Sequence, residues 1–368
     1  MYLTSNRKRS FDDVDFPLSF PPIPEGWMTP VMPEEPTDFR KTLPKHPGGD
    51  HLSVTNGHQR DKNLRFEAAT HSYFIKGQPS SGSVTSLIHE FVEEFNPDSV
   101  IDKMVSGNNW PRPGYLRNVI PVKALETFKR VPAASLFLRQ FHQTDRDERH
   151  LCELMTTLRA EYPCLTSAFD EVTLSREEIF QKWDNHRVES ANRGTWMHLC
   201  FEMFLNGVTV DEKTAEFRLF RKFLQQLSGW TTFRTEWTIY GDEENLAGSI
   251  DFVAIDSTNR LLLVDWKRSK ELRRKYEGVK NMLSPLNHIP DVPGWHYRLQ
   301  LNCYAYLIEK YYGYVVARML VVCLHPDNGE QPFVDSVPRL DKEVDEIMSL
   351  QRLFARRRVI VELSDSDE

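Results

Sequence analysis

Two carboxylates and a lysine stand at the ends of two predicted strands. The stretch LAGSIDFVAIDSTNRLLLVDWKRSK, residues 246–270, predicts neighbouring strands, and the second is an apolar run that ends in Asp265, Trp266 and Lys267. Side chains alternate along a strand, so Asp265 and Lys267 point to the same face. Asp251 lies on the preceding strand, within cross-strand reach if the two strands form a regular hairpin.

Like charges held this close predict a bound cation. Two carboxylates repel each other, and burying them is costly unless a positive charge neutralises them. Oxygen ligands at a strand end suit Mg²⁺ or Mn²⁺. Lys267 would orient or activate a water at such a site and stabilise the charge that builds on a phosphate. The alternative interpretation of D-x-K alone is an ion pair at a solvated strand end.

Two features nearby favour the metal site. Gly248, three residues before Asp251, permits the close approach of a backbone or a ligand, although it equally suits a bulge. His198 and Glu202 are spaced i, i+4 on a predicted helix and share one face. Such a pair is more often a surface hydrogen bond, but beside carboxylates a neutral imidazole is a further metal ligand.

The helix after the D-x-K strand carries Gln300 and Tyr304, again at i, i+4. Tyr297, Tyr304 and Leu307 have the spacing of a core stripe. Gln300 is the unusual residue of that stripe, because a buried amide requires hydrogen-bond partners.

Length and composition limit the class of protein. The chain has 368 residues, 40% of them apolar, which is compatible with one large domain or two small ones. No apolar run approaches the roughly 20 residues that cross a membrane. The first residues, MYLTSNRKRSFDDVDF, lack the apolar core of a signal peptide. We therefore predict no membrane partner and a location in the nucleus or cytoplasm.

Cysteine usage and net charge exclude several further classes. The five cysteines are scattered without a C-x-x-C pair, which argues against a disulfide framework, a zinc finger and an iron–sulfur cluster. Cys200, Cys303 and Cys323 stand among apolar residues and are predicted core residues. A net charge of −7 argues against an all-round basic nucleic-acid binder but is compatible with a local basic groove.

Four segments follow one another along the chain. Residues 1–62 are predicted to be disordered, since nine of the 22 prolines lie in the first 50 residues; NRKR at 6–9 is half of a nuclear-import signal or a solvated charge run. Residues 63–190 contain a hairpin at 64–77, a helix capped by Ser83 or Thr85 and a mostly helical region. Residues 191–358 form the predicted core domain, and residues 359–368 an acidic tail.

The core domain has a clear order of elements. Helices are predicted at 191–207, closed by Asn206 and Gly207, and at 211–227. Strands follow at 233–241, 246–256 and 260–266, then a helix at 296–313, a strand at 315–324 and a helix at 340–355. The order α-β-β-β-α-β predicts an α/β or α+β domain on a mixed sheet. The sequence shows no phosphate-binding G-x-x-x-x-G-K.

In this order, G-x-x-x-H (194–198), G-x-x-D (248–251), D-x-K (265–267) and Q-x-x-x-Y (300–304) resemble the motifs of the PD-(D/E)XK nuclease superfamily, and within it the RecB-like exonuclease branch. The resemblance covers about residues 190–325. It implies a restriction-endonuclease-like core, a mixed β-sheet flanked by helices, here with an N-terminal helical region. The hairpin and SVTSLI near 70–90 are also similar to the opening of some phage-type and mitochondrial exonucleases of this branch.

The resemblance assigns roles to the motif residues. It implies that Asp251 and Asp265 bind Mg²⁺ or Mn²⁺, that Lys267 is the catalytic lysine, and that His198 and the Trp266 carbonyl are further ligands. The remaining residues are Gln300 and Tyr304 at the wall of the site, where they position the DNA strand, and the auxiliary acids Glu202 and Glu236. Glu236 could equally be a surface strand residue.

The chain departs from the family pattern in three respects. The first acidic motif reads Ser-Ile-Asp where RecB-like members have Pro-Asp, and the iron–sulfur cysteines of some relatives are missing. No helicase motif accompanies the nuclease motifs. ATP-driven resection would therefore need a helicase, or a replication or recombination protein, in trans.

A basic stretch follows the D-x-K motif. KRSKELRRKYEGVK, residues 267–280, suits phosphate contacts, and we predict them for Arg268, Ser269 and Lys270. For residues 273–275 a solvated helix face is an equal alternative. Residues 281–296 form either a loop over the active site, with an aromatic that stacks on a base, or a packed surface loop.

The predicted function is metal-dependent hydrolysis of DNA, as an exonuclease in repair, recombination or replication, including that of a virus or mobile element. DNA is favoured over RNA by the family resemblance. One alternative is a catalytically silent module that binds nucleic acid or a partner, which the intact Asp251, Asp265 and Lys267 disfavour. The other is an RNA endonuclease, which the Q-x-x-x-Y helix disfavours.

Overall fold

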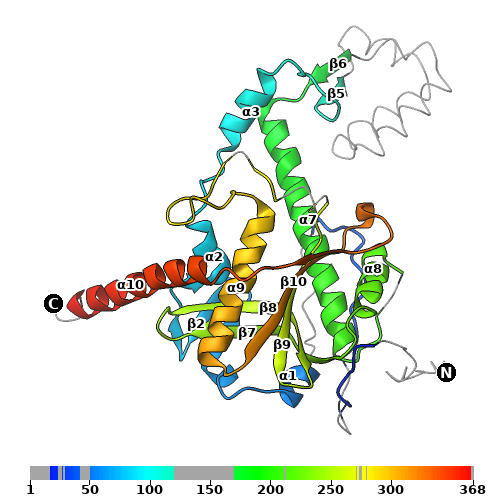
Figure 1. Ribbon diagram of the computed structural model, residues 1–368. Helices are drawn as coiled ribbons and strands as arrows, with labels where there is room; N and C mark the ends of the chain where they lie inside the picture. The colour runs from blue at the N-terminus through cyan, green and yellow to red at the C-terminus, as the bar shows by residue number, and fades with distance from the viewer. Residues whose placement is uncertain are drawn as a thin grey trace, which may run out of the picture. The chain divides into compact units, whose positions relative to one another are not determined.

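The computed structural model describes residues 17–23, 27, 30–41, 50–119, 170–210, 213–270, 272, 276–278 and 280–365 (Figure 1). Residues 1–94 and 188–368 form one compact unit and residues 95–187 a second. The predicted NRKR segment, most of the predicted helical region at 120–190, the basic residues 273–275 and the end of the acidic tail lie outside the described residues.

The larger unit is built on a mixed six-stranded sheet. Its strands are β4 (Gly82–Ser83), β7 (Trp230–Gly241), β8 (Leu246–Asp256), β9 (Arg260–Lys267), β10 (Val315–Cys323) and β11 (Phe333–Ser336). The order is β11-β10-β9-β8-β4, and β7 also pairs with β8. The β9–β10 and β4–β8 pairs are parallel, and the other pairs are antiparallel. The predicted mixed sheet flanked by helices is thus confirmed.

Strand β8 is where the sheet opens. On one edge β7 pairs along the whole strand, from Leu246 to Asp256. On the other edge β4 pairs with Leu246 and Ala247, and β9 pairs only from Phe252 to Ile255. Among the described residues, no strand pairs with residues 248–251 on this edge. The main chain of β8 therefore diverges from β9 where Asp251 stands.

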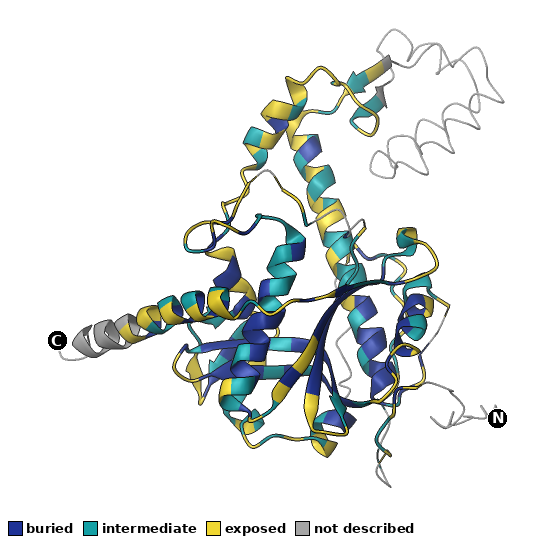
Figure 2. Ribbon diagram, viewed as in Figure 1, coloured by how far each residue is buried: buried dark blue, intermediate teal, exposed yellow. Residues whose placement is uncertain are grey.

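Helices cover both faces of the sheet (Figure 1). Helices α7 (Arg176–Leu205) and α8 (Ala215–Leu224) cover one face, and α2 (Val84–His89), α9 (Pro293–Tyr311) and α10 (Asp341–Asp365) cover the other. Along β9, Leu262 and Val264 pack in the α7–α8 core while Leu261 and Leu263 pack in the α9 core. The strands of the sheet are mostly buried (Figure 2), as expected for a sheet covered on both sides.

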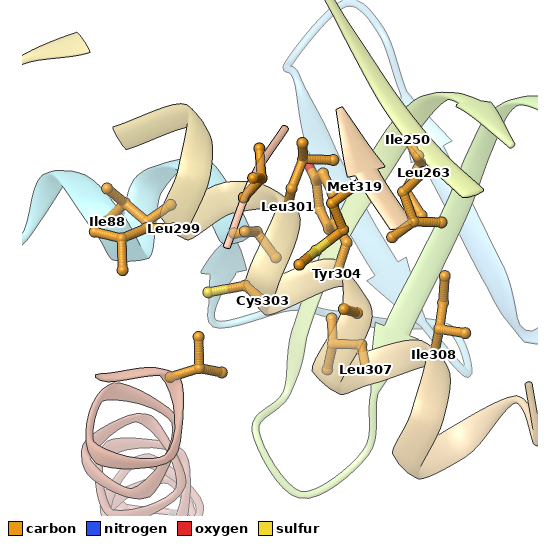
Figure 3. Packing of buried hydrophobic residues seen from close by; sticks show 14 of the residues in the cluster. Ile88, Ile250, Leu263, Leu299, Leu301, Cys303, Tyr304, Leu307, Ile308 and Met319 are labelled. Carbon is orange, nitrogen blue, oxygen red and sulfur yellow. The ribbon is translucent and has the colours of Figure 1, made fainter. Parts of the chain in front are cut away.

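Helix α9 packs against the strands that carry the predicted site. Figure 3 shows its side chains Leu301, Tyr304 and Ile308 among residues of the sheet such as Ile250 and Leu263. All five belong to one core cluster. Helix α9 is apolar on several sides and packs between the sheet, α2 and α10. Its polar residues therefore have a fixed position relative to β8 and β9.

Local signals set the helix ends, at Ser83 and Gly207 as predicted and at Thr214, which shortens the helix predicted at 211–227 to Ala215–Leu224. Ser83 caps α2 by accepting a hydrogen bond from the amide of Ser86, and Thr214 caps α8 by accepting one from the amide of Phe217 at 3.2 Å. Gly207, with φ 86°, follows the end of α7, where a left-handed residue terminates a helix. The predicted core residues Cys200, Cys303 and Cys323 are buried.

The N-terminal segment contributes to the core more than predicted. A hairpin of β1 (Leu64–Glu67) and β2 (Ser72–Ile75), extended by β3 (Gln78–Pro79), stands at the predicted place, and α1 (His51–Thr55) and the 3₁₀ turn η2 (Asp61–Asn63) precede it. Within residues 1–62, predicted to be disordered, Leu18, Phe39 and Leu52 are buried in the α7–α8 core. The high proline content predicted disorder, but it carries no information on whether single apolar residues of the segment find a surface of the folded domain to pack on.

The second unit contains α3 (Pro97–Val105), β5 (Leu116–Val119) paired with β6 (Asp170–Thr173), and the start of α7. Arg176 joins two of its elements through ion pairs with Asp98 and Asp102 of α3. The sequence predicts residues 63–190 as part of one nuclease domain, whereas residues 95–187 form a unit of their own.

In the larger unit a second 3₁₀ turn, η5 (Pro326–Asn328), follows β10. Among the described residues, no helix has the length and apolar content to cross a membrane.

Candidate active site

The two predicted acids stand where β8 and β9 separate. The last paired residues of the ladder are Phe252 and Val264, so the next position on each strand is Asp251 and Asp265. Asp251 Oδ2 accepts a hydrogen bond from the amide of Trp266 at 2.7 Å. The side chain of Asp251 thus takes a main-chain donor of β9 and is fixed at the fork.

Asp265 and Lys267 share a face, as their alternation predicts. Lys267 Nζ lies 2.9 Å from Oδ1 and 2.8 Å from Oδ2 of Asp265, whose exposed fraction is 2%. The same ammonium lies 4.6 Å from the ring centroid of Tyr297. Burial lowers the pKa of Lys267, but the negative charges of Asp265 and Asp251 outweigh burial and raise it above its ordinary value. Lys267 is therefore held as a cation.

His198 reaches the fork from α7. Its Nε2 lies 3.1 Å from the Trp266 carbonyl oxygen, and since a carbonyl only accepts, Nε2 carries a hydrogen and donates it. Nδ1 then faces Glu236 at 3.7 Å and Asp251 at 3.6 Å. Burial lowers the pKa of His198, but the charge of Asp251 and a hydrogen bond to Glu236 raise it to about 9. The Trp266 carbonyl thus orients the imidazole so that Nδ1 points at the two acids.

Glu236 belongs to the same cluster. In the β7–β8 register Thr235 pairs with Phe252 and Trp237 with Ile250, which places Glu236 opposite Asp251. Its φ is +44°, a left-handed conformation that is costly for a residue other than glycine and is concentrated at functional sites. Its Oε2 accepts a hydrogen bond from Ser249 at 3.2 Å. Of the two predicted roles, the auxiliary acid is the one that this geometry favours.

The cluster fits a divalent cation. One ligand atom each from His198, Glu236 and Asp251 all lie within 4.8 Å of one another. Burial raises the pKa of Asp251 to about 7, and the nearby acids add to the shift. Oδ2 of Asp265 is buried and accepts no hydrogen bond from any described residue, although Lys267 Nζ is close to it. Carboxylates joined by one imidazole suit Mg²⁺ or Mn²⁺.

Two residues predicted to contribute to the metal site have other positions or contacts in the structure. The Trp266 carbonyl, predicted as a ligand, accepts the hydrogen bond of His198 and orients the imidazole. Such a group supports a metal ligand without binding the metal itself. Glu202, predicted as an auxiliary acid, is not in the set formed by His198, Glu236 and Asp251. Alternation and helical spacing could not distinguish Glu202 from Glu236, because the choice depends on the pairing of β7 with β8.

Gln300 and Tyr304, predicted to form a wall of the site, lie one turn apart on α9 and contact each other. Gln300 Nε2 donates a hydrogen bond to the Tyr304 hydroxyl at 2.9 Å, which gives the half-buried amide a hydrogen-bond partner. The Tyr304 ring is 3% exposed and lies against Gly248. Burial raises the pKa of Tyr304 well above its ordinary value, so the hydroxyl stays neutral. Gly248 thus permits the approach of a side chain rather than of a backbone or ligand.

The predicted phosphate-binding residues have protein partners. Arg268 Nε donates to Glu216 of α8 at 2.8 Å, and Lys270 Nζ lies 2.7 Å from Asp327. The Ser269 carbonyl accepts from Asn328 at 3.1 Å. Phosphate contacts from these residues stay a prediction, and for Arg268 they would compete with an ion pair.

The segment 281–296 is packed rather than open. Met282, Leu286 and Ile289 are buried in the α9 core. Trp295 lies in the first turn of α9 and donates its indole hydrogen to the Tyr276 carbonyl at 3.1 Å. Of the two predicted interpretations of this segment, the structure favours the packed surface loop, and Trp295 has a structural partner in place of a base.

Two tyrosines at the site were not predicted as functional. Tyr297 has core spacing along α9, but its ring faces the ammonium of Lys267. Tyr73 comes from the hairpin, and the charge of Glu236 contributes to its raised pKa, which places the two near one another. No local signal marks either residue, because both contacts join segments far apart in the sequence.

Comparison with known proteins agrees with this arrangement. Residues 212–362 match the family model of the PD-(D/E)XK nuclease superfamily. The match includes Glu236, Asp251, Asp265 and Lys267, whereas His198 and Tyr73 lie before it. None of the curated proteins compared with the chain matches it. The matching residues hold strands β7 to β11 of the sheet and its acidic fork, and this part of the chain, residues 212–362, is a domain of the PD-(D/E)XK nuclease superfamily.

Proposed function

We propose that this chain is a metal-dependent deoxyribonuclease of the RecB-like branch that removes nucleotides from DNA ends. The carrying observation is the convergence of His198, Glu236 and Asp251 within 4.8 Å, with the buried Asp265 and its partner Lys267 on the neighbouring strand. The superfamily match supports hydrolysis of a nucleic-acid phosphodiester. DNA, end-directed cleavage and a role in repair, recombination or replication, including that of a virus or mobile element, are proposed from the resemblance of the motifs.

Four residues would hold the cation. They are the converging His198, through Nδ1, and Glu236 and Asp251, through carboxylate oxygens, together with Asp265, which lies outside that set but has a buried Oδ2 that accepts no hydrogen bond from the described residues. When bound, Mg²⁺ or Mn²⁺ supplies positive charge to the oxygens that attack and leave phosphorus and lowers the pKa of a water. Burial lowers the pKa of His198, and the negative charges of Asp251 and Glu236 that raise it are the charges that the cation would neutralise.

Lys267 would act as a cation and hydrogen-bond donor. Its raised pKa disfavours a neutral amine that abstracts a proton. Asp265 and the Tyr297 ring fix the ammonium, so the donor is oriented before the substrate arrives. Such a preorganised charge stabilises the negative charge that develops on the phosphate.

The role of Gln300 and Tyr304 would be to shape the wall that the DNA strand meets. Their mutual hydrogen bond fixes the amide, and burial fixes the ring. We expect Gln300→Ala to impair cleavage less than substitutions of Asp265 or Lys267, because it removes a positioning contact and leaves the charges in place. A helicase or replication protein in trans is a further proposal, motivated by the lack of a phosphate-binding loop in the sequence.

The decisive experiment is a cleavage assay on linear and closed-circular DNA, each single- and double-stranded. It uses Mg²⁺, Mn²⁺ and EDTA arms, with Lys267→Ala and Asp265→Ala as inactive variants. Lys280→Ala is the matched control, because Lys280 lies on the following loop and pairs with the exposed Glu93. We expect metal-dependent loss of linear DNA with circles spared, abolished in both variants and unchanged in the control.

Other outcomes select other functions. Cut circles would identify an endonuclease, and cleavage of an RNA substrate alone would identify an RNA endonuclease. Binding without cleavage by well-folded protein would identify a silent nucleic-acid-binding module. Wild-type rates in Lys267→Ala and Asp265→Ala would overturn the assignment of the site.

A further inference from the structure

The hairpin β1–β2 carries a row of aromatic rings. Phe66 on β1 pairs directly with Tyr73 on β2, and their ring centroids are 4.7 Å apart with an interplanar angle of 40°. The His71 ring meets the edge of Phe66 at 5.2 Å and 88°. Directly opposite residues share one face of a hairpin, so Phe66 and Tyr73 present their rings on the same side.

The inner end of this row packs on the strands that carry the acidic cluster. Tyr73 is 7% exposed and packs in a small core with Ala247, the residue before Gly248, against which Tyr304 lies. Burial raises the pKa of Tyr73 to about 12, and the negative charge of Glu236 adds to the shift. Tyr73 therefore packs on the paired residues Tyr240 and Ala247, on the same two strands that carry Glu236 and Asp251.

The outer end of the row is open to solvent. Phe66 is 38% exposed, although the rest of the same face, Leu64 and Ile75, packs on the core. His71 holds its ring against Phe66 from a left-handed backbone with φ 51°. An exposed aromatic ring braced on two sides has little side-chain entropy left to lose when a planar group covers it.

The chemistry of the row favours a base over a phosphate. The neighbouring cation on β1, Arg65, lies on the opposite face of the hairpin, where its guanidinium covers the Phe74 ring at 4.1 Å. Among the residues of β1 and β2, the face with Phe66 and Tyr73 therefore offers π surfaces and no arginine or lysine. A nucleic-acid base stacks on such a surface without regard to its identity.

We propose that Phe66, braced by Tyr73 and His71, is a stacking site for an unpaired base of the strand whose backbone lies at the acidic cluster. This inference rests on the proposed nuclease function and specifies its substrate as a single-stranded or frayed end. A base inside a duplex is already stacked on its neighbours and would have to be displaced before it reached Phe66.

The test measures binding separately from cleavage. The probe is a fluorescent single-stranded deoxyoligonucleotide of mixed sequence, compared with its blunt duplex and with a version abasic at the terminal positions, in a Lys267→Ala background with Mg²⁺. The variants are Phe66→Leu, Phe66→Trp and, as the matched control on the opposite face, Phe74→Leu. Thermal unfolding of each variant is measured in parallel.

We expect Phe66→Leu to weaken single-strand binding on the order of tenfold, as loss of one base–aromatic stack does. Phe66→Trp should retain the affinity, and Phe74→Leu should change it by less than about twofold. The parent should bind the abasic probe more weakly than the intact single strand. The Phe66→Leu variant and the parent should bind the abasic probe with equal affinity, and both should bind the duplex with equal affinity. Equal affinities of Phe66→Leu and the parent for the single strand would overturn the inference.

Failure of this inference and failure of the proposed function are distinguishable. If the wild-type chain does not cleave DNA but Phe66→Leu weakens single-strand binding, the stacking site stands and the nuclease assignment falls. If the wild-type chain cleaves DNA and Phe66→Leu binds and cleaves like wild type, the stacking site falls and the nuclease assignment stands.

Discussion

Gly248 of β8 lies directly beneath the ring of Tyr304 of α9. A Cβ on Gly248 would lie 2.6 Å from Cε1 and 3.1 Å from the hydroxyl oxygen of Tyr304. The ring is almost fully buried, so it has no free space into which it can move. The glycine of the G-x-x-D motif and the tyrosine of the Q-x-x-x-Y motif are therefore a single packing unit that sets the distance between α9 and the acidic fork.

Substitution of Gly248 by alanine tests this contact. We expect Gly248→Ala to lower the free energy of unfolding by about 1–3 kcal/mol, as overpacking of a core does, and to reduce cleavage by displacing Tyr304. Denaturant unfolding and a single-turnover cleavage rate measure the two effects. The matched control is Gly194→Ala in α7, where a Cβ meets nothing within 4 Å; a helical alanine there should be neutral or stabilise by about 0.5–1 kcal/mol. Equal effects of the two substitutions would contradict the packing role of Gly248.

Substitution of Tyr297 tests how Lys267 is oriented. Because the ammonium lies over the ring, Tyr297→Leu should lower the single-turnover cleavage rate on the order of tenfold, the size of a partly desolvated cation–π contact. Tyr297→Phe keeps the ring and should retain most of the rate. DNA affinity should change little in either variant. A loss of rate in Tyr297→Phe as large as in Tyr297→Leu would show that the hydroxyl, and not the ring, is the important group.

The composition of the metal site predicts which substitutions weaken Mn²⁺ binding. Asp251→Asn, Glu236→Gln and His198→Ala should each weaken binding at least about tenfold, because each removes one of three converging ligand atoms. Titration calorimetry with the metal alone measures this without reference to activity. Glu243→Gln is the control, since Glu243 is exposed and pairs with Lys310. If Glu236→Gln bound Mn²⁺ as wild type does, Glu236 would not be a ligand, and its left-handed backbone would need another explanation.

Glu244 makes the fold sensitive to acid. Its carboxylate is fully buried and accepts hydrogen bonds from Tyr306, Lys310, Tyr311 and Arg352. Burial raises the pKa of Glu244, but these four donors outweigh burial and lower it below the ordinary 4.5. A lowered folded-state pKa means that the stabilisation is complete above pH 4.5 and is lost as pH falls through the folded-state value.

The measurement is denaturant unfolding of metal-free protein between about pH 7 and pH 3. The free energy of unfolding should decline as the pH falls below 4.5, and Glu244→Gln should be less stable at neutral pH and lose part of this decline. The neighbouring Glu243→Gln, which also removes a partner of Lys310, should keep the wild-type pH dependence. Identical pH profiles for the two variants would show that the acid sensitivity arises elsewhere.

The sequence by itself determined the four long strands of the sheet, β7 to β10, and the order in which their chemistry occurs, but not the short strands β4 and β11. Strand β8 begins and ends at the predicted residues, 246 and 256, because the alternation and the turn around Asn259, with φ 60°, are local properties. Asp265 and Lys267 share a face for the same local reason. The mixed sheet followed from the order of the predicted elements, and its flanking helices from the family resemblance of the motifs.

Only the tertiary structure decided which side chains meet. The choice of Glu236 over Glu202 depends on the register of β7 against β8, and the contacts of Tyr297 and Tyr73 join a helix and an N-terminal hairpin to strands far away in sequence. The ion pair of Arg268 with Glu216 likewise depends on how α8 packs on the sheet. Spacing along the chain specifies a face of a helix or strand, whereas the partner across that face is set by the packing of the whole domain.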